Sequence, residues 1–215
     1  MRAARAGYHA AMTRHRLEAF SDGVIAILIT IMVLELAVPH GTRLGDLLAE
    51  WPVLISYVLS FAYLAIYWNN HHHMLYVTER VDGTILWANM LLLFCLSLVP
   101  FATAWMGENQ FADVPTAVYG AVLLAAAFSY YVLQWAIIRS QGEGSVLKAA
   151  IGGDVKGKAS LVMYVVAIPS ALVQPWVAYG LYAAVAAMWL IPDRRIERVV
   201  RAAEDERRAA GEETD

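Results

Sequence analysis

The chain has 215 residues, of which 60% are apolar and only 16% charged, with a net charge of −3. Soluble domains are about one quarter charged, so this composition excludes an ordinary soluble protein and indicates a lipid bilayer as its surroundings. The charge balance gives no sign of a nucleic-acid partner, and a single cysteine, Cys95, excludes an intrachain disulfide and a thiolate metal site. We therefore expect an all-α membrane protein.

The first predicted span covers residues 17–38. A polar stretch containing Arg16, Ser21 and Asp22 leads directly into an uninterrupted apolar run that ends at Leu34 and is followed by Glu35. Placing ionisable residues at the ends of a membrane helix costs free energy, and such residues are typical of functional sites. A signal peptide cleaved near residues 37–39 is an alternative, which the hydroxyl and acidic pair against the apolar run disfavours.

The remaining apolar runs predict five more helices. Three are near or above the ~20 residues needed to cross a bilayer and are expected over 51–72, 83–106 and 115–138. The uncharged stretch over 159–191 is too long for one span, and Pro169 or Gln174-Pro175 offers a break. We expect spans over 156–174 and 176–192, which gives a six-helix membrane domain over 1–192 and a charged cytoplasmic tail over 193–215.

The basic residues predict the orientation of these six helices. With both termini in the cytoplasm, every Lys and Arg except Arg43 falls on the cytoplasmic side, as the positive-inside rule requires. The opposite side is acidic, with five carboxylates against that one arginine: Glu35, Asp46, Glu50, Glu108 and Asp113. Such a surface concentrates cations, although short external loops that simply avoid Lys and Arg would look the same.

Two features of the first helix have chemical meaning. Ile27, Ile31 and Leu34 share one face, with Thr30 beside them. Such an apolar stripe can form a hydrophobic constriction in an ion path, and it can equally be ordinary helix packing or lipid contact. Glu18 and Asp22, one turn apart, need a compensating partner, and Arg16 is turned away from Asp22.

The end of the second predicted span can supply that partner, because the topology brings Trp68 and the three histidines His71 to His73 level with Asp22. A histidine beside a membrane carboxylate can orient it, donate to it or titrate near neutral pH. Three consecutive histidines point about 100° apart on a helix and cannot all bind one ion, so a metal centre is disfavoured. The tryptophan is also typical of an interfacial anchor.

These motifs resemble the signature of the endolysosomal transmembrane potassium channel family. The resemblance is carried by Arg16-x-x-x-Phe20-Ser21-Asp22, followed by Gly-Val-x-Ala-Ile, and by Trp68-Asn-Asn-His71-His72 on the second helix. It is to the prokaryotic branch, which has one six-helix repeat per chain. His73 and the long tail are not part of the signature.

The resemblance implies a homotetramer in the plasma membrane of a prokaryote, permeable to potassium and other monovalent cations. The first helices would surround a pore without a pore-loop filter, and Glu35 would lie at its outer mouth. No enzymatic activity, cofactor, metal or nucleic-acid partner is implied. The implied pore constriction is formed by Ile27, Thr30, Ile31 and Leu34, and the implied cytoplasmic-end network by Arg16, Ser21, Asp22, Trp68, His71 and His72.

Two other functions remain open from the sequence. The first is a proton-coupled secondary transporter that uses Asp22 and the histidine cluster as a relay. The second is a membrane enzyme with a metal centre of histidines and carboxylates, which the tight clustering of the histidines makes the weaker reading.

Overall fold

The computed structural model describes residues 2–36, 38–78, 80–142, 145, 147–148, 152 and 154–190, with backbone alone for residues 2–13. The predicted tail over 193–215 and the last two residues of the sixth predicted span lie outside the described residues. Within them the chain is helical, and four helical segments are long and apolar enough to cross a membrane: Arg14–Leu34, Trp51–Tyr76, Gly83–Glu108 and Asp113–Gln141.

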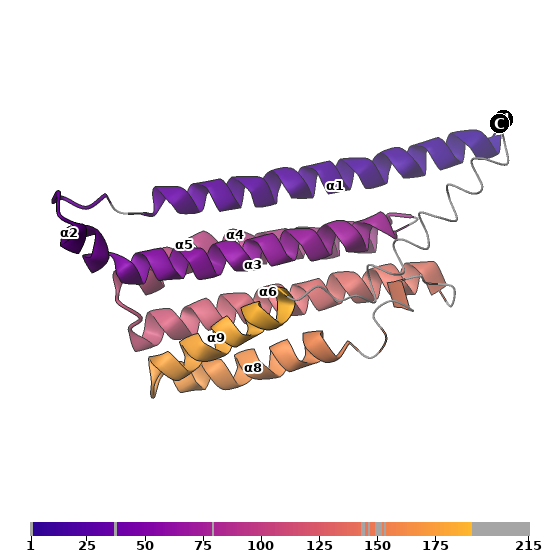
Figure 1. Ribbon diagram of the computed structural model, residues 1–215. Coiled ribbons are helices and arrows are strands. Elements are labelled where there is room, and N and C mark those ends of the chain that lie inside the picture. The colour runs from indigo at the N-terminus through magenta and orange to yellow at the C-terminus, as the bar shows by residue number, and fades with distance from the viewer. Residues whose placement is uncertain are drawn as a thin grey trace.

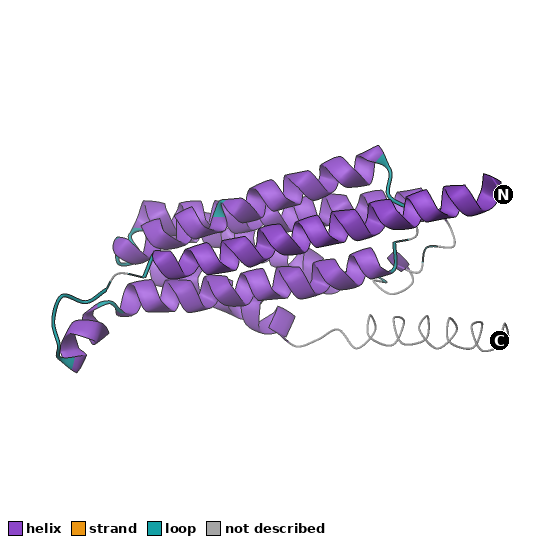
Figure 2. Ribbon diagram, turned by 90° about the horizontal axis from the view of Figure 1, so that it is seen from above, coloured by secondary structure: helices purple, strands orange, loops and turns teal. Residues whose placement is uncertain are grey.

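The described residues form eight helices, and the longer ones lie side by side along one direction (Figures 1 and 2). Their bounds are α1 Arg2–Leu34, α2 Leu44–Ala49, α3 Trp51–Tyr76, α4 Gly83–Ser97, α5 Val99–Glu108, α6 Asp113–Gln141, α8 Val155–Ala171 and α9 Pro175–Leu190. The short α2 lies at the end of the bundle where α1 ends and α3 begins (Figure 1).

Helix ends fall where the sequence offers a cap or a proline. The Asp82 carboxylate accepts from the Ile85 N–H at the start of α4, and the Asp154 carboxylate accepts from the Gly157 N–H at the start of α8. At the far end of α6, Gly142 has φ +70°, a left-handed conformation that a glycine adopts without strain.

Two prolines divide the apolar runs. The run expected as one helix over 83–106 is interrupted at Leu98, because Pro100 has no N–H to donate to the carbonyl one turn earlier. The long final run breaks over 172–174, just before Pro175, while Pro169 stays inside α8. With 17 and 16 residues, α8 and α9 are shorter than the four long segments.

The interior holds a group of hydrogen-bonded hydroxyls. Tyr63 donates to the Tyr182 carbonyl (2.6 Å), the Tyr182 hydroxyl donates to the Thr116 carbonyl (3.1 Å), and Ser60 bonds to both Tyr119 and Thr103. Polar groups remote from water need such partners. These contacts tie α3, α5, α6 and α9 into one core. Helix α1 lies at one side of the bundle and packs against α3, α4 and α5.

Candidate functional site: the polar end and exposed face of α1

The first half of the site is a buried hydrogen-bonded chain that joins α3, α4 and α1. His71 Nε2 lies 2.7 Å from Asn89 Oδ1, Asn89 Nδ2 donates to Ser21 Oγ (2.9 Å), and Ser21 donates to the Leu17 carbonyl (2.8 Å). The three side chains of His71, Asn89 and Ser21 are 0% exposed. A polar chain without access to water holds its helices in one arrangement, because breaking any bond leaves a buried group unsatisfied.

The donors of this chain can be assigned from its own geometry. The Ser21 hydroxyl uses its single proton on the Leu17 carbonyl, so it accepts from the Asn89 amide N–H. The Asn89 amide oxygen then faces His71, whose Nε2 must carry a proton to donate to it. His71 Nδ1 is buried without a hydrogen-bond partner among the described residues. The neutral Nε2–H tautomer satisfies these constraints.

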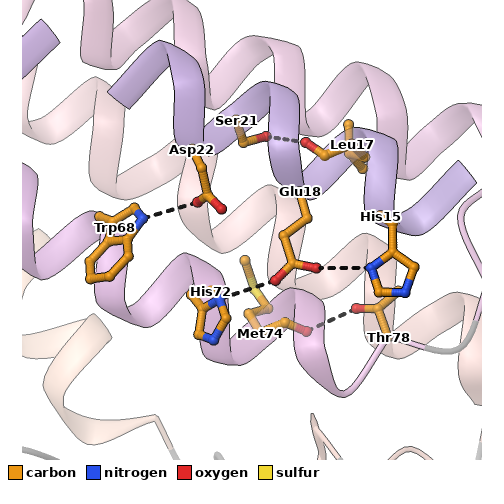
Figure 3. Close-up of polar contacts among 9 residues, drawn as sticks. All are labelled: His15, Leu17, Glu18, Ser21, Asp22, Trp68, His72, Met74 and Thr78. Carbon is orange, nitrogen blue, oxygen red and sulfur yellow. Dashed lines mark hydrogen bonds and ion pairs between the residues drawn. The ribbon is translucent and has the colours of Figure 1, made fainter. Parts of the chain in front are cut away.

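The second half of the site is a ladder of contacts between α1 and α3. Trp68 Nε1 donates to Asp22 Oδ1 (3.0 Å), and His72 Nδ1 lies 3.0 Å from Glu18 Oε1 (Figure 3). His15 approaches the other oxygen of Glu18 at 3.9 Å. The mutual repulsion expected for Glu18 and Asp22 is therefore relieved by a separate α3 partner for each carboxylate.

A third rung extends the ladder by one more turn. The Arg14 guanidinium lies 5.6 Å from the centre of the Tyr76 ring and donates to the Thr78 carbonyl (3.4 Å). Each step of four residues backward along α1 thus matches a step of four forward along α3. This is the register of two antiparallel helices that present one face to each other. Trp68 and His72, neighbours on that face, also stack on each other.

The opposite side of α1 carries the predicted apolar stripe. Ile27, Ile31 and Leu34 are 58%, 38% and 81% exposed, and Thr30 is exposed between them. The Thr30 hydroxyl donates to the Ile27 carbonyl (2.9 Å). Ile25, Leu28 and Met32 on the other side of the same helix are buried against the bundle. The stripe therefore faces away from its own protomer.

The remaining predicted site residues lie apart from these contacts. Arg16 is exposed and has no partner among the described side chains, in keeping with its position turned away from Asp22. Glu35 is exposed in the turn after α1. The hydrogen bonds within the described part of the chain give no support to the relay of the transporter hypothesis, since Asp22 bonds to Trp68, and His71 to Asn89. The same part holds no group of three His, Cys, Asp or Glu side chains placed to bind a metal.

Sequence reasoning missed several residues of the site, of which Asn89 and Arg14 are the most important. Asn89 is central to the buried chain, yet it is a single amide within an apolar run and forms no motif. Arg14 was counted only among the basic residues that set the orientation. The signal for Arg14 was its position one turn before Glu18, which places it on the face of α1 that carries both carboxylates.

The fold and the site define a helical, multi-pass membrane protein whose first helix is held by polar contacts on one side and presents an apolar face on the other. A protein-family model described as "Endosomal/lysosomal potassium channel TMEM175" matches residues 16–100, which hold the whole site except its Arg14 rung and His15. A protein named potassium channel from Chryseobacterium sp. (strain P1-3) is 51% identical over 87% of this chain and 97% of its own length. The chain belongs to the TMEM175 family.

Further relatives agree with this assignment. A protein named potassium channel from Streptomyces collinus is 38% identical over 58% of this chain and 65% of its own length. Among solved structures, the crystal structure of a lysosomal potassium-selective channel TMEM175 homolog from Chamaesiphon minutus matches with a TM-score of 0.75 and 29% identity. The match covers 85% of this chain and 98% of that one. The family is one of channels rather than enzymes.

Proposed function

We propose that this chain forms a potassium-permeable cation channel in a prokaryotic plasma membrane. Four copies assemble with their α1 helices around a common axis, and both termini of each copy lie in the cytoplasm. Helices α1, α3, α4 with α5, and α6 give four crossings, and the shorter α8 and α9 give the remaining two. The potassium-channel names of the bacterial relatives support the ion, and the basic residues support the orientation.

The observation that carries the proposal is the exposed stripe of α1. Ile27, Ile31 and Leu34 face outward, while the other side of α1 is fixed to α3 and α4 by buried or paired polar groups. Anchoring is what holds one stripe at a constant distance from an axis shared with other copies. The stripes then form an apolar neck, which resists ions by dewetting and by stripping part of their hydration.

The pore proposed here has no filter of backbone carbonyls. Helix α1 is continuous from Arg2 to Leu34, so the carbonyls before its last turn are occupied by helical hydrogen bonds. Selectivity must then come from the width of the neck and is expected to be modest. Thr30 gives one polar contact within it, because a hydroxyl that donates its proton to Ile27 keeps its oxygen lone pairs for a passing cation.

The acidic end of the bundle raises the cation concentration at the outer mouth. Glu35 follows α1 directly, Asp46 and Glu50 belong to the α2 segment, and Glu108 and Asp113 flank the turn between α5 and α6. The end of α1, helix α2, the start of α3 and the turn between α5 and α6 lie at the same end of the bundle (Figure 1). A surface of one sign attracts counter-ions, with an effect that falls as ionic strength rises.

Reversal potentials in planar bilayers test this proposal. Purified protein under a potassium-to-sodium gradient is expected to pass unitary currents. Their reversal potential should be shifted from zero toward the equilibrium potential of potassium. Ile27→Asn is expected to raise the conductance or reduce the potassium preference, because it wets the neck. Ile55→Asn, the same change at an exposed isoleucine of α3, is the control and should leave both unchanged. Saturable transport without unitary currents, or identical currents from Ile27→Asn and wild type, would contradict the proposal.

A further inference from the structure

A cavity of about 340 Å³ lies on the side of α3 that faces away from α1. Its walls come from α3, α6, α8 and α9, and Tyr67 and Asn70 line it from α3. Their sequence neighbours Trp68 and His71 bond instead to Asp22 and Asn89. One helix therefore separates the cavity from the polar end of α1, and the cavity is distinct from the proposed pore. Its volume is in the range of small-molecule sites.

The walls of the cavity are largely aromatic. They include Tyr63, Tyr67, Tyr130, Tyr164 and Trp189. The Tyr67 and Tyr130 rings meet edge to face at 6.0 Å, and Tyr63 and Tyr164 lie 6.5 Å apart. Rings arranged in this way offer both faces and edges to a further ring. They favour an occupant with a flat, apolar body.

The wall includes polar side chains that form no hydrogen bond with the described part of the chain, among them Gln134 and Tyr67. Gln134 is only 7% exposed, and neither its amide nitrogen nor its amide oxygen is bonded. The Tyr67 hydroxyl is likewise without a bond. Other polar groups of the wall are satisfied: Tyr63 donates to Tyr182, and Asn70 donates to the Ile66 carbonyl. The Gln134 amide therefore keeps a donor and an acceptor open to the cavity, which a hydroxyl or amide of a bound molecule can use.

The acidic and basic side chains that line the cavity, Asp154, Lys156 and His73, each have a contact within the protein. The Asp154 carboxylate accepts from the Gly157 N–H (3.1 Å), and the Lys156 ammonium lies 5.9 Å from the centre of the Trp189 ring. The two charges have opposite sign and lie two residues apart. The Gln134 amide and the Tyr67 phenol, which remain open to the cavity, are both neutral. The cavity therefore suits a neutral head group better than an anion or a cation.

We propose that the cavity between α3, α6, α8 and α9 binds a neutral amphiphile, with a ring body among the tyrosines and one hydroxyl or amide head on Gln134 and Tyr67. This goes beyond the proposed function and does not depend on ion conduction. A hydroxyl-headed membrane lipid and a soluble aromatic alcohol share this chemistry.

Calorimetric titration of the full chain in lipid nanodiscs tests the proposal, with empty nanodiscs subtracted. Four naphthalene probes differ only in the head: 2-naphthalenemethanol, 2-methylnaphthalene, 2-naphthoate and 2-naphthylmethylammonium. We expect the alcohol to bind about tenfold tighter than the other three, as one buried hydrogen bond allows. Gln134→Leu should remove most of that advantage. Gln174→Leu, the same change at an exposed glutamine, should behave as wild type.

A second variant keeps the test decisive if Gln134→Leu folds poorly. Ala127→Trp places a large ring on the cavity wall and should abolish binding of all four probes. Competition by cholesterol, a hydroxyl-headed lipid with a ring body, would assign the natural occupant to the membrane, and its absence would assign it to a soluble amphiphile. Equal affinity for the alcohol and for 2-methylnaphthalene, tighter binding of either charged probe, or no binding above empty nanodiscs would overturn the proposal. None of these results bears on the proposed channel, whose test is electrical.

Discussion

Replacing Asn89 by leucine tests whether the buried chain holds α1 in place. The substitution removes the acceptor for His71 Nε2 and the donor to Ser21 Oγ, while the Ser21 hydroxyl keeps its bond to the Leu17 carbonyl. The lost Asn89–Ser21 bond costs about 0.5–1.5 kcal/mol, and the buried His71 N–H left unpaired costs about 1–3 kcal/mol. We expect a total of roughly 2–4 kcal/mol.

Thermal unfolding of the purified protein in detergent measures this loss. At roughly 2–4 °C per kcal/mol for a chain of this size, the midpoint should fall by about 4–16 °C. Asn109→Leu is the matched control, because that exposed amide bonds only to the Trp105 carbonyl one turn earlier. A midpoint for Asn89→Leu equal to that of Asn109→Leu would refute the reasoning.

The double variant His71→Phe with Asn89→Leu separates a lost bond from an orphaned group. Removing both partners leaves no unsatisfied imidazole, and such paired replacements can be nearly neutral. We therefore expect the double variant to be more stable than Asn89→Leu alone. If the two losses simply add, the His71 imidazole is not the group that carries the cost.

Two further predictions concern the ladder and the core. Trp68→Phe keeps an aromatic ring but removes the indole N–H that bonds to Asp22. It should reduce the free energy of unfolding by about 1 kcal/mol, because that carboxylate is partly exposed. An unchanged unfolding midpoint would show that the bond between Trp68 and Asp22 does not stabilise the protein. Gly120→Ala should reduce the free energy of unfolding by about 1–3 kcal/mol and so lower the midpoint, because the added methyl would collide with the Tyr182 hydroxyl. Gly180→Ala meets nothing within 4 Å and is the control; equal midpoints would contradict close packing at Gly120.

Hydropathy and proline positions predicted much of the fold. The four long apolar runs became the four long helical segments, and the break before Pro175 lies where the excess length of the last run required one. The interruption at Leu98 was missed, because a proline in a membrane helix is often tolerated and its effect depends on the neighbours that satisfy the freed carbonyl. The expected end of the first helix at 38 was also too late, since α1 stops at Leu34.

The candidate site was only partly accessible from the sequence. The spacing of Glu18 and Asp22 predicted that both carboxylates need partners. The predicted topology placed Trp68 and the histidines at the same depth in the membrane as these carboxylates. Which histidine meets which group depends on the rotation of α3 about its axis: His72 faces Glu18, whereas His71 points to Asn89. No periodic pattern encodes that rotation. Gln134 was missed for a similar reason. Whether its amide has a hydrogen-bond partner depends on residues that only the fold brings next to it.

Access of a charged thiol reagent to Thr30 tests the central claim most directly. In a Cys95→Ala background, Thr30→Cys carries the chain's single thiol, on the exposed stripe between Ile27 and Ile31. If α1 lines the ion path, a membrane-impermeant cationic methanethiosulfonate should reduce the potassium current through Thr30→Cys, and should leave Ile55→Cys in the same background unaffected. A current through Thr30→Cys that persists, while only a lipid-soluble maleimide labels the thiol, would place the stripe in lipid and contradict the account.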